Sequence, residues 1–153
     1  MARGSAARAA LLLSAFLAGC AGAPRRAAHP PDSVEGKAVI RVARSYLPEE
    51  GSRPVPEDCS DFVRKVFGER KHPLPRSAVT MAALGTPVKS SRELAMGDLL
   101  FFTGSSGKGV GHVAIYVHNG IFIHLSKKSE GVRMESLYSD YYRKHYLFAR
   151  RVL

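Results

Sequence analysis

The chain has few cysteines, few acidic residues and no long apolar run. Its two cysteines are Cys20 and Cys59, in a sequence of 153 residues. No segment reaches the ~20 consecutive apolar residues that a membrane-spanning helix needs, and the sequence shows no internal repeats. If the two cysteines serve separate purposes, neither has a disulfide partner within its own chain. A lone thiol is unusual in an exported domain, so Cys59 needs a reason such as catalysis or an intermolecular bridge.

The shortage of acidic residues leaves the chain strongly basic. It contains 23 Lys and Arg against 13 Asp and Glu, which gives a formal net charge of +10 at pH 7. Such an excess suits an anionic partner, whether nucleic acid, anionic lipid or a polymer that carries carboxylates. For an exported protein nucleic acid is the least suitable of these, and we expect none as a partner. Cell-wall peptides, whose D-glutamate and diamino acids carry carboxylates, fit the charge well.

Residues 1–19 have the pattern of a signal peptide. Arg3 and Arg8 provide a positively charged start, and residues 9–18 form an apolar core that is too short to span a bilayer. The run Leu17-Ala18-Gly19-Cys20 ends this segment and resembles the bacterial lipobox. The plainer interpretation is a cleaved secretory signal in which Cys20 has no role.

The resemblance to a lipobox implies a lipid-anchored protein. Cleavage before Cys20 would leave a net charge of +8, and acyl chains such as palmitate would be attached at this residue. Stable anchoring generally takes more than one chain. We therefore expect a monomer in the cell envelope, held at the membrane surface by lipid on Cys20, with a periplasmic domain. Ala21 follows Cys20 in place of Asp, which resembles sorting to the outer membrane in Gram-negative bacteria.

The remainder of the chain is expected to form a linker and one domain. Residues 20–36 are interpreted as a flexible linker, because Ala, Pro and Arg dominate and no apolar periodicity is present. The folded domain is predicted to cover 37–153, a length that suits a single core. Helical patterns precede strand patterns, so the predicted fold class is α+β. We predict helices at 37–47, from about Asp58 to a C-cap at Gly68, and at 77–84, a helical turn at 137–142, and strands at 99–102, 112–118, 121–126, 131–136 and 145–152.

The predicted hairpin decides whether two histidines, His112 and His124, can cooperate. A two-residue loop at Asn119-Gly120 would send them to opposite faces of the sheet. A three-residue loop that includes His118, with Gly120 left-handed in a bulge, places them on one face as diagonal neighbours ~7–8 Å apart at the backbone. In this register Ala114 faces His124. We predict the three-residue loop because it makes the opposite face wholly aliphatic, with Val113, Ile115, Val117, Ile121, Ile123 and Leu125.

Cys59, His112 and His124 together supply a nucleophile, a base and an orienting group. Cys59 is predicted at a helix N-terminus, where unpaired N–H groups and the helix dipole lower a thiol pKa from ~8.5 to as little as ~3.5–7.5. His112 would take the thiol proton and later protonate the leaving amine. His124 would lie behind His112 and set its tautomer and ring plane. The small Ala114 would leave room for the helix, and the Cys59 N–H would contribute to an oxyanion hole.

Each of these residues also has a plainer interpretation. A single Cys at a helix start is often a packed hydrophobe, and a single His on a strand is often structural. Zinc bound by Cys59, His112, His124 and a water is a further alternative. No second cysteine or closely spaced ligand pair supports it, so we expect no metal and no cofactor. The other histidines are expected on the surface or in the linker: His29, His72, His118 and His145.

Several short motifs follow one another in a set order along the predicted domain. They are Asp58-Cys59-Ser60-Asp61-Phe62-Val63, Leu74-Pro75-Arg76-Ser77, Gly97-Asp98-Leu99-Leu100-Phe101-Phe102, Gly111-His112-Val113-Ala114-Ile115-Tyr116 and Phe122-Ile123-His124. This order, with the twelve-residue step between the two histidines, resembles the NlpC/P60 family of cell-wall peptidases over about residues 37–153. The resemblance implies a papain-like fold in which N-terminal helices pack on an antiparallel sheet of about five strands.

The resemblance also implies a function and a set of roles. The family typically hydrolyses amide bonds in peptidoglycan stem peptides, often between D-glutamate and a diamino acid, through a thiolate nucleophile and an acyl-enzyme. Its nucleophile, base and orienting residue fall on Cys59, His112 and His124. Two other functions stay open. One is a lipoprotein that binds wall fragments without cutting them, and the other is an amidase or acyltransferase on a substrate outside the wall.

Residues around the nucleophile are expected to contact the substrate. Asp58 and Ser60 flank Cys59, and Arg76 would bind a substrate carboxylate unless it forms an ion pair within the fold. The sequence departs from the family pattern at two places. Asp61 stands where the family usually has Gly, and the loop at 48–56 lacks the usual Tyr and paired glycines.

Overall fold

The computed structural model describes residues 32–51, 53–127 and 131–153. The predicted signal peptide, Cys20 and most of the predicted linker lie outside these residues. Within the described ranges, no helix is long and apolar enough to cross a membrane. The helices are α1 (Val34–Arg44), α2 (Cys59–Glu69), α3 (Ala78–Met81) and α4 (Asp140–His145), with a short 3-10 helix, η1 (Ser91–Glu93).

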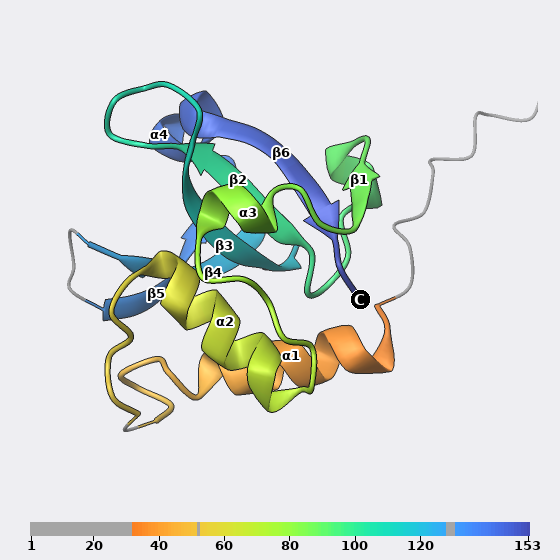
Figure 1. Cartoon of the computed structure of the whole chain (residues 1–153), viewed down its shortest axis with the longest axis vertical. Helices are drawn as coiled ribbons and strands as arrows, with labels where there is room; N and C mark the ends of the chain where they lie inside the picture. Colours follow the sequence, from red (N-terminus) through yellow and green to blue (C-terminus); the bar gives the residue numbers. More distant parts are fainter. Residues whose placement is uncertain (1–31, 52, 128–130) are drawn as a thin grey trace, which may run out of the picture.

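Six antiparallel strands of the described chain form one sheet in the order β1-β6-β2-β3-β4-β5 (Figure 1). The strands are β1 (Thr86–Val88), β2 (Leu99–Thr103), β3 (Val110–His118), β4 (Ile121–Ser126), β5 (Gly131–Ser136) and β6 (Tyr146–Arg151). The predicted α+β class and antiparallel sheet are confirmed. The prediction of about five strands missed β1, an edge strand of three residues that is too short to show an alternating pattern.

Side-chain caps decide where the helices begin. Ser33 accepts the Gly36 N–H at 2.8 Å, so α1 begins at Val34, three residues before the predicted start. Asp58 and Ser77 cap α2 and α3 in the same way, and both starts are as predicted. The predicted C-cap at Gly68 is wrong, because that residue lies inside α2. The left-handed conformation after the helix belongs to Lys71, with φ of 61°.

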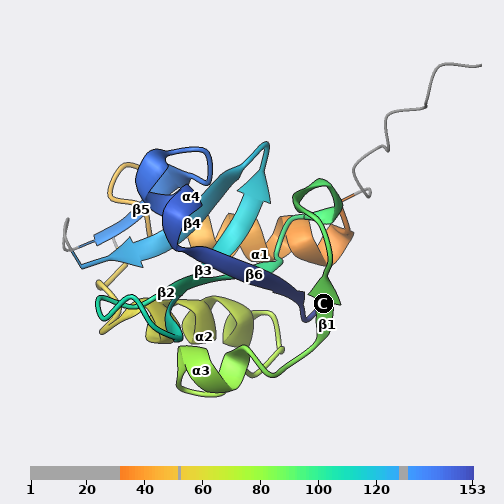
Figure 2. The ribbon, with the colours of Figure 1, turned by 90° about the horizontal axis from the view of Figure 1, so that it is seen from above.

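The sheet separates two hydrophobic cores. On one face, α1 and α2 bury Val39, Phe62 and Phe67 against aliphatic residues of β3 and β4 such as Ile115 and Ile123. On the other face, the core consists of Leu94, Leu100, Phe102, Ala114, Tyr116, Phe122 and Ala149, with Tyr142 of α4 packed against it. Figures 1 and 2 show α2 and α4 on opposite sides of β2 and β3. The expectation that α2 would approach over Ala114 is therefore wrong, because α2 covers the aliphatic face.

The register of the β3–β4 hairpin is the one predicted, although its turn is different. Ile115 pairs with Ile123 and Tyr116 with Phe122. The turn itself has two residues, Asn119 and Gly120, with φ of 50° and 77°. The extra residue that keeps the predicted register is a bulge at Val117, between the Tyr116 and His118 pairs. A left-handed Gly120 was predicted, whereas the two-residue turn and the position of the bulge were not.

Asp98 joins β2, β3 and β6 at one end of the sheet. Its carboxylate is 2% exposed in the folded protein and accepts the Ala95 N–H at 2.9 Å and two Arg151 N–H groups at 2.8 and 2.7 Å. Its backbone oxygen accepts the Tyr116 N–H at 2.8 Å. The Asp98 side chain therefore ties the last strand to the start of β2.

Asp98→Ala should destabilise the fold, because it leaves Arg151 without its buried partner. Breaking a buried ion pair costs about 3–5 kcal/mol, and since Arg151 is partly exposed we expect a loss of about 3 kcal/mol in urea unfolding. Asp140→Ala is the control, because the Asp140–Arg143 pair is exposed and such pairs contribute about 0–1 kcal/mol. Equal losses in the two variants would contradict a stabilising role for the buried pair.

Candidate active site

Cys59 is the first residue of α2, and its thiol lies beside the start of β3. Asp58 caps the helix by accepting the Asp61 N–H at 2.8 Å, which leaves the first N–H groups of α2 free near the sulfur. The N–H groups of Ser60 and Val113 both interact with the Cys59 sulfur. Val113 directly follows His112 in β3, so the thiol lies against the backbone of the strand that carries the predicted base.

The Val113 N–H is available because the β3–β4 ladder ends before it. Tyr116 exchanges backbone hydrogen bonds with the segment that leads into β2. Alternate residues of a strand direct their N–H groups to opposite sides, so the Val113 N–H is directed toward β4. Pairing between β3 and β4 stops at Ile115 and Ile123. The Cys59 sulfur therefore meets the sheet where these two strands separate.

Burial dominates the ionisation of the thiol. Burial raises the pKa of Cys59, and the negative charge of Asp58 raises it further. The Val113 and Ser60 N–H groups and the charge of Lys127 lower the pKa without reversing this shift. The direction is opposite to the lowered pKa expected from the helix N-terminus alone, because that expectation left out desolvation. The thiol is therefore protonated in the substrate-free protein at neutral pH.

His112 and His124 form a direct pair across β3 and β4. Their Nε2 and Nδ1 atoms lie 2.8 Å apart, and the two rings are nearly perpendicular, with centroids 4.9 Å apart. This contact confirms the predicted hydrogen bond between the two histidines and their shared face. It engages the Nε2 atom of His112, so Nδ1 is the nitrogen of His112 left for another partner.

Desolvation keeps both rings neutral. Burial lowers the pKa of His112 to about 4, and the charge of Lys127 adds to the shift. Burial lowers the pKa of His124 to about 3, with further contributions from His112 and Arg133. At neutral pH the site therefore holds a neutral thiol and two neutral imidazoles.

Gly111 shapes the backbone directly before His112. It is the extra residue of a bulge in β3, since Phe102 pairs with His112 and Thr103 pairs with Val110. A Cβ atom at Gly111 would lie 2.3 Å from the Cα atom of Gly104. A side chain at this position would therefore force β3 away from β2 and move His112.

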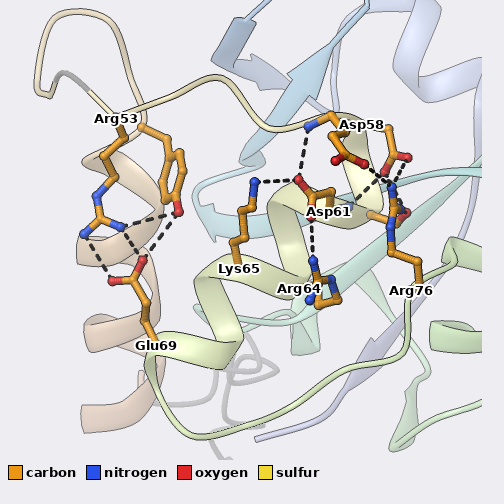
Figure 3. A network of polar contacts seen from close by, with 10 residues as sticks. Arg53, Asp58, Asp61, Arg64, Lys65, Glu69 and Arg76 are labelled. Atoms are coloured by element: carbon orange, nitrogen blue, oxygen red, sulfur yellow. Dashed lines mark hydrogen bonds and ion pairs between the residues drawn. The ribbon is translucent and has the colours of Figure 1, made fainter.

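Asp58, Ser60 and Arg76, the predicted substrate-binding residues, contact one another (Figure 3). Arg76 donates to both carboxylate oxygens of Asp58, at 3.0 and 2.8 Å, to Ser60 Oγ at 2.9 Å, and to Glu57 at 3.1 Å. The Arg76 contact holds the pKa of the Asp58 carboxyl well below its usual range. Arg76 thus forms the ion pair within the fold that was the alternative to binding a free carboxylate.

Asp61, which departs from the family pattern, anchors the loop that leads to Cys59. It is 1% exposed and accepts the Glu57 N–H at 3.1 Å, and it pairs with Arg64 and Lys65 one turn along α2 at 2.8 Å each (Figure 3). Burial raises the pKa of Asp61, but the hydrogen bonds from Lys65, Glu57 and Arg64 outweigh it and lower the pKa overall. The Asp61 carboxylate therefore fixes the loop through these contacts, which a glycine at this position could not make.

Two residues near the site were not identified from the sequence. The Tyr142 hydroxyl lies 3.2 Å from His124 Nε2. Lys127 is exposed, and its charge acts on both Cys59 and His112. No motif connects either residue to the site. Tyr142 reaches His124 only because the fold brings α4 onto β4.

The histidine geometry is that of a hydrogen-bonded pair rather than of two metal ligands. Zinc ligands direct their lone pairs at one shared ion, whereas His112 Nε2 and His124 Nδ1 are directed at each other. Within the described ranges, no group of three His, Cys, Asp or Glu side chains is placed to hold a metal ion.

Comparison with known families and curated proteins gives a consistent result. The sequence profile of the NlpC/P60 family matches residues 49–151. The chain is 43% identical over 98 residues to the murein DD-endopeptidase MepS/murein LD-carboxypeptidase of Escherichia coli K12, covering 63% of this chain and 50% of that protein. It is 34% identical over 95 residues to the gamma-D-glutamyl-L-lysine dipeptidyl-peptidase of Bacillus subtilis, covering 61% of this chain and 32% of that protein. The chain thus spans about half the length, or less, of these relatives.

Solved structures also match the fold. A crystal structure of an NlpC/P60 family protein from Bacillus cereus superposes with a TM-score of 0.68 at 29% sequence identity. The match covers 80% of this chain and 41% of that protein.

Because burial holds both histidines neutral, the fold should lose stability as the pH falls from about 6.5 toward 4. The unfolded chain takes up a proton on each histidine near 6.5, whereas the folded protein does so only at about 4 for His112 and about 3 for His124. The unfolded state thus binds more protons in this window, and each histidine contributes a slope of up to about 1.4 kcal/mol per pH unit. Urea unfolding across this range measures the slope.

His124→Gln should make that slope shallower, because one buried titrating group is lost. His118→Gln is the matched control, since His118 is an exposed residue on the same strand as His112 and its loss should leave the slope unchanged. The same slope in the wild type and in His124→Gln would show that the buried histidine does not contribute.

Proposed function

The chain belongs to the NlpC/P60 family, and we propose that it is a cysteine peptidase that hydrolyses amide bonds in the stem peptides of peptidoglycan. The observation that carries the proposal is the direct contact between His112 and His124 on the strands β3 and β4. Cys59 stands at the start of α2, against the backbone of β3 near the point where β3 and β4 separate. The names of the relatives, a murein endopeptidase and a gamma-D-glutamyl-L-lysine dipeptidyl-peptidase, support a wall-peptide substrate.

The neutral resting site favours a proton transfer that accompanies nucleophilic attack. The Cys59 sulfur attacks the carbonyl carbon while its proton moves to His112 Nδ1, which is the nitrogen not engaged by His124. The N–H groups of Val113 and Ser60, which lower the pKa of the thiol, would stabilise the negative charge as it develops. The N–H of Cys59 itself would stabilise the oxyanion.

Collapse of the tetrahedral intermediate completes acylation. The C–N bond breaks, the leaving amine takes the proton from His112, and a thioester remains on Cys59. Water then attacks the thioester carbonyl and gives a proton to His112. The C–S bond breaks, the acid product leaves, and His112 returns the proton to the Cys59 sulfur. We propose that the amide bond hydrolysed in this way lies between D-glutamate and a diamino acid.

The polar cluster beside Cys59 supports a role in substrate binding. Asp58, Ser60 and Arg76 hold one another in place immediately before and within the first turn of α2. The Glu57 contact of Arg76 is the one that a substrate carboxylate can replace, because the Glu57 side chain is 78% exposed whereas that of Asp58 is 35% exposed. We propose that the substrate carboxylate binds Arg76 at this position.

We also propose that lipid on Cys20 anchors the domain at the periplasmic surface of a membrane, and of the outer membrane if the source is Gram-negative. The support is the run Leu17-Ala18-Gly19-Cys20, which lies outside the residues that the structure describes.

Cys20→Ser should abolish incorporation of an alkyne-labelled palmitate and release the protein from the membrane fraction. Cys59→Ala is the control and should retain both label and membrane association. A labelled Cys20→Ser protein would contradict anchoring at this residue.

Cys59→Ala should abolish hydrolysis of defined muropeptides, because it removes the sulfur on which the acyl-enzyme forms. His112→Gln should lower kcat by about 10²–10⁴-fold, the usual contribution of a general base. His118→Gln, which changes an exposed histidine on the same strand, should retain wild-type activity. Product masses identify the bond, provided that the peptides offer both a D-glutamyl–diamino acid bond and a bond between two D-configured residues.

Three outcomes would contradict the proposal. Full activity of Cys59→Ala would exclude the nucleophile. Binding of muropeptides by the wild type without any product would make the protein a wall-fragment binding protein. Hydrolysis or acyl transfer on amides outside the wall, with none on muropeptides, would assign it to the third class.

A further inference from the structure

The His112–His124 pair continues to a third group, the hydroxyl of Tyr142. His124 Nδ1 faces His112 Nε2 at 2.8 Å, and His124 Nε2 faces the Tyr142 oxygen at 3.2 Å. Both nitrogens of His124 are thus engaged by side chains, from β3 on one side and from α4 on the other. His124 is 2% exposed, so water has little access to replace either partner.

Aromatic contacts fix where the Tyr142 hydroxyl lies. The Tyr142 ring packs edge-on against Phe122 and Phe102, with centroids 4.8 and 5.6 Å apart, and also against the His124 ring at 5.5 Å. Phe122 and Phe102 are fully buried residues of the sheet. The position of the hydroxyl is therefore set by rigid neighbours on two strands rather than by the short helix alone.

The protons on His112, His124 and Tyr142 can be arranged along these hydrogen bonds in two ways. If Tyr142 accepts, the His124 proton is on Nε2, His124 Nδ1 accepts from His112 Nε2–H, and His112 Nδ1 carries the lone pair that takes a proton from Cys59. If Tyr142 donates, every proton shifts by one position, and His112 Nδ1 carries a hydrogen. Only the first arrangement leaves His112 able to act as a base.

We propose that Tyr142 is a positioning residue that accepts the His124 Nε2–H hydrogen bond and thereby holds His112 in the tautomer that serves as the base. The inference rests on the proposed function, because it assigns the direction of proton transfer in the same site. The arrangement also needs no rearrangement when His112 gains a second proton, since its Nε2–H already donates to His124. Tyr142 touches neither the substrate nor the nucleophile and acts through the two histidines.

Other charged and titratable groups around the pair do not supply this acceptor. Lys127 acts on His112 and Arg133 of β5 acts on His124, and both are cations. Glu135 of β5 influences Tyr142 and pairs with Arg133 at 2.9 Å. Burial raises the pKa of Tyr142 to about 12, so its hydroxyl stays protonated and neutral across the working pH range. Among the described residues, Tyr142 is the group in hydrogen-bond contact with His124 Nε2.

Tyr142→Phe tests the inference, because it removes the hydroxyl and retains the ring that packs on Phe122 and Phe102. We expect kcat for muropeptide hydrolysis to fall about 10- to 100-fold, the loss found when the hydrogen-bond partner that orients a metal-ligating imidazole is removed, with KM little changed. The acidic limb of the pH–rate profile should move to lower pH, because the protonated form of His112 loses support. Tyr141→Phe is the matched control, since Tyr141 neighbours Tyr142 on α4 but is 62% exposed.

The ¹⁵N chemical shifts of the histidine rings provide a readout that packing alone would not move. In the wild type, His124 should carry its proton on Nε2 and His112 should carry its proton on Nε2 as well. In Tyr142→Phe the His124 signal should shift toward a mixture of tautomers, whereas Tyr141→Phe should match the wild type. A wild-type His124 protonated on Nδ1, or a Tyr142→Phe enzyme with unchanged kcat and pH profile, would overturn the inference.

The two proposals fail in distinguishable ways. If the wild type hydrolyses no muropeptide, the proposed function is wrong, and the ring shifts of His124 still decide whether Tyr142 sets its tautomer. If the wild type is active and the ring shifts of Tyr142→Phe match those of the wild type, the peptidase proposal stands and the positioning role of Tyr142 is wrong.

Discussion

The register of β3 against β4 is the constraint on which the candidate active site depends. Side chains alternate along a strand, so a slip of one residue would move His124 to the aliphatic face beneath α2 and separate it from His112. The bulge at Val117 and the left-handed Asn119-Gly120 turn hold the register in which the two rings meet. The same pairing ends at Ile115 and Ile123, and this leaves the Val113 N–H free for the Cys59 sulfur. One hairpin thus sets both the histidine contact and the place where the thiol meets the sheet.

Burial acts on every ionisable group of the site and in one direction, toward the uncharged form. It raises the pKa of Cys59 and lowers the pKa of His112 and His124. The α2 N-terminus by itself would favour a thiolate, but its N–H groups do not outweigh desolvation in the substrate-free protein. In the proposed reaction, charge develops only during proton transfer and attack, where fixed N–H groups would stabilise it without reorganisation.

Although the chain is basic overall, several carboxylates cluster around the nucleophile. Each of these carboxylates is paired with a basic side chain. Asp58 is held by Arg76, and Asp61 is held by Arg64, Lys65 and the Glu57 N–H. These contacts fasten the loop before Cys59 to the first turns of α2. They also show how the chain accommodates Asp61 in place of the usual glycine, since the carboxylate has partners on the helix and on the loop.

Much of the architecture follows from the sequence because its signals are local. The caps Asp58 and Ser77, the alternation in β3 and β4, and the turn residues near Gly120 act over a few residues. They predicted the starts of α2 and α3, the antiparallel sheet and the shared face of His112 and His124. The β1 edge strand, the extension of α2 beyond Gly68 and the face that α2 covers could not be predicted in this way. They depend on which surfaces pack together once the sheet has formed.

The roles of Arg76, Cys59 and Tyr142 show the same division. The sequence by itself determined which residue types stand at the helix N-terminus and on the hairpin, because capping and strand alternation are properties of neighbouring residues. Only the tertiary structure decided that Arg76 pairs with Asp58, that burial opposes ionisation of Cys59, and that Tyr142 reaches His124. Desolvation and contacts between α4 and β4 arise from groups far apart in the chain, and no local pattern encodes them.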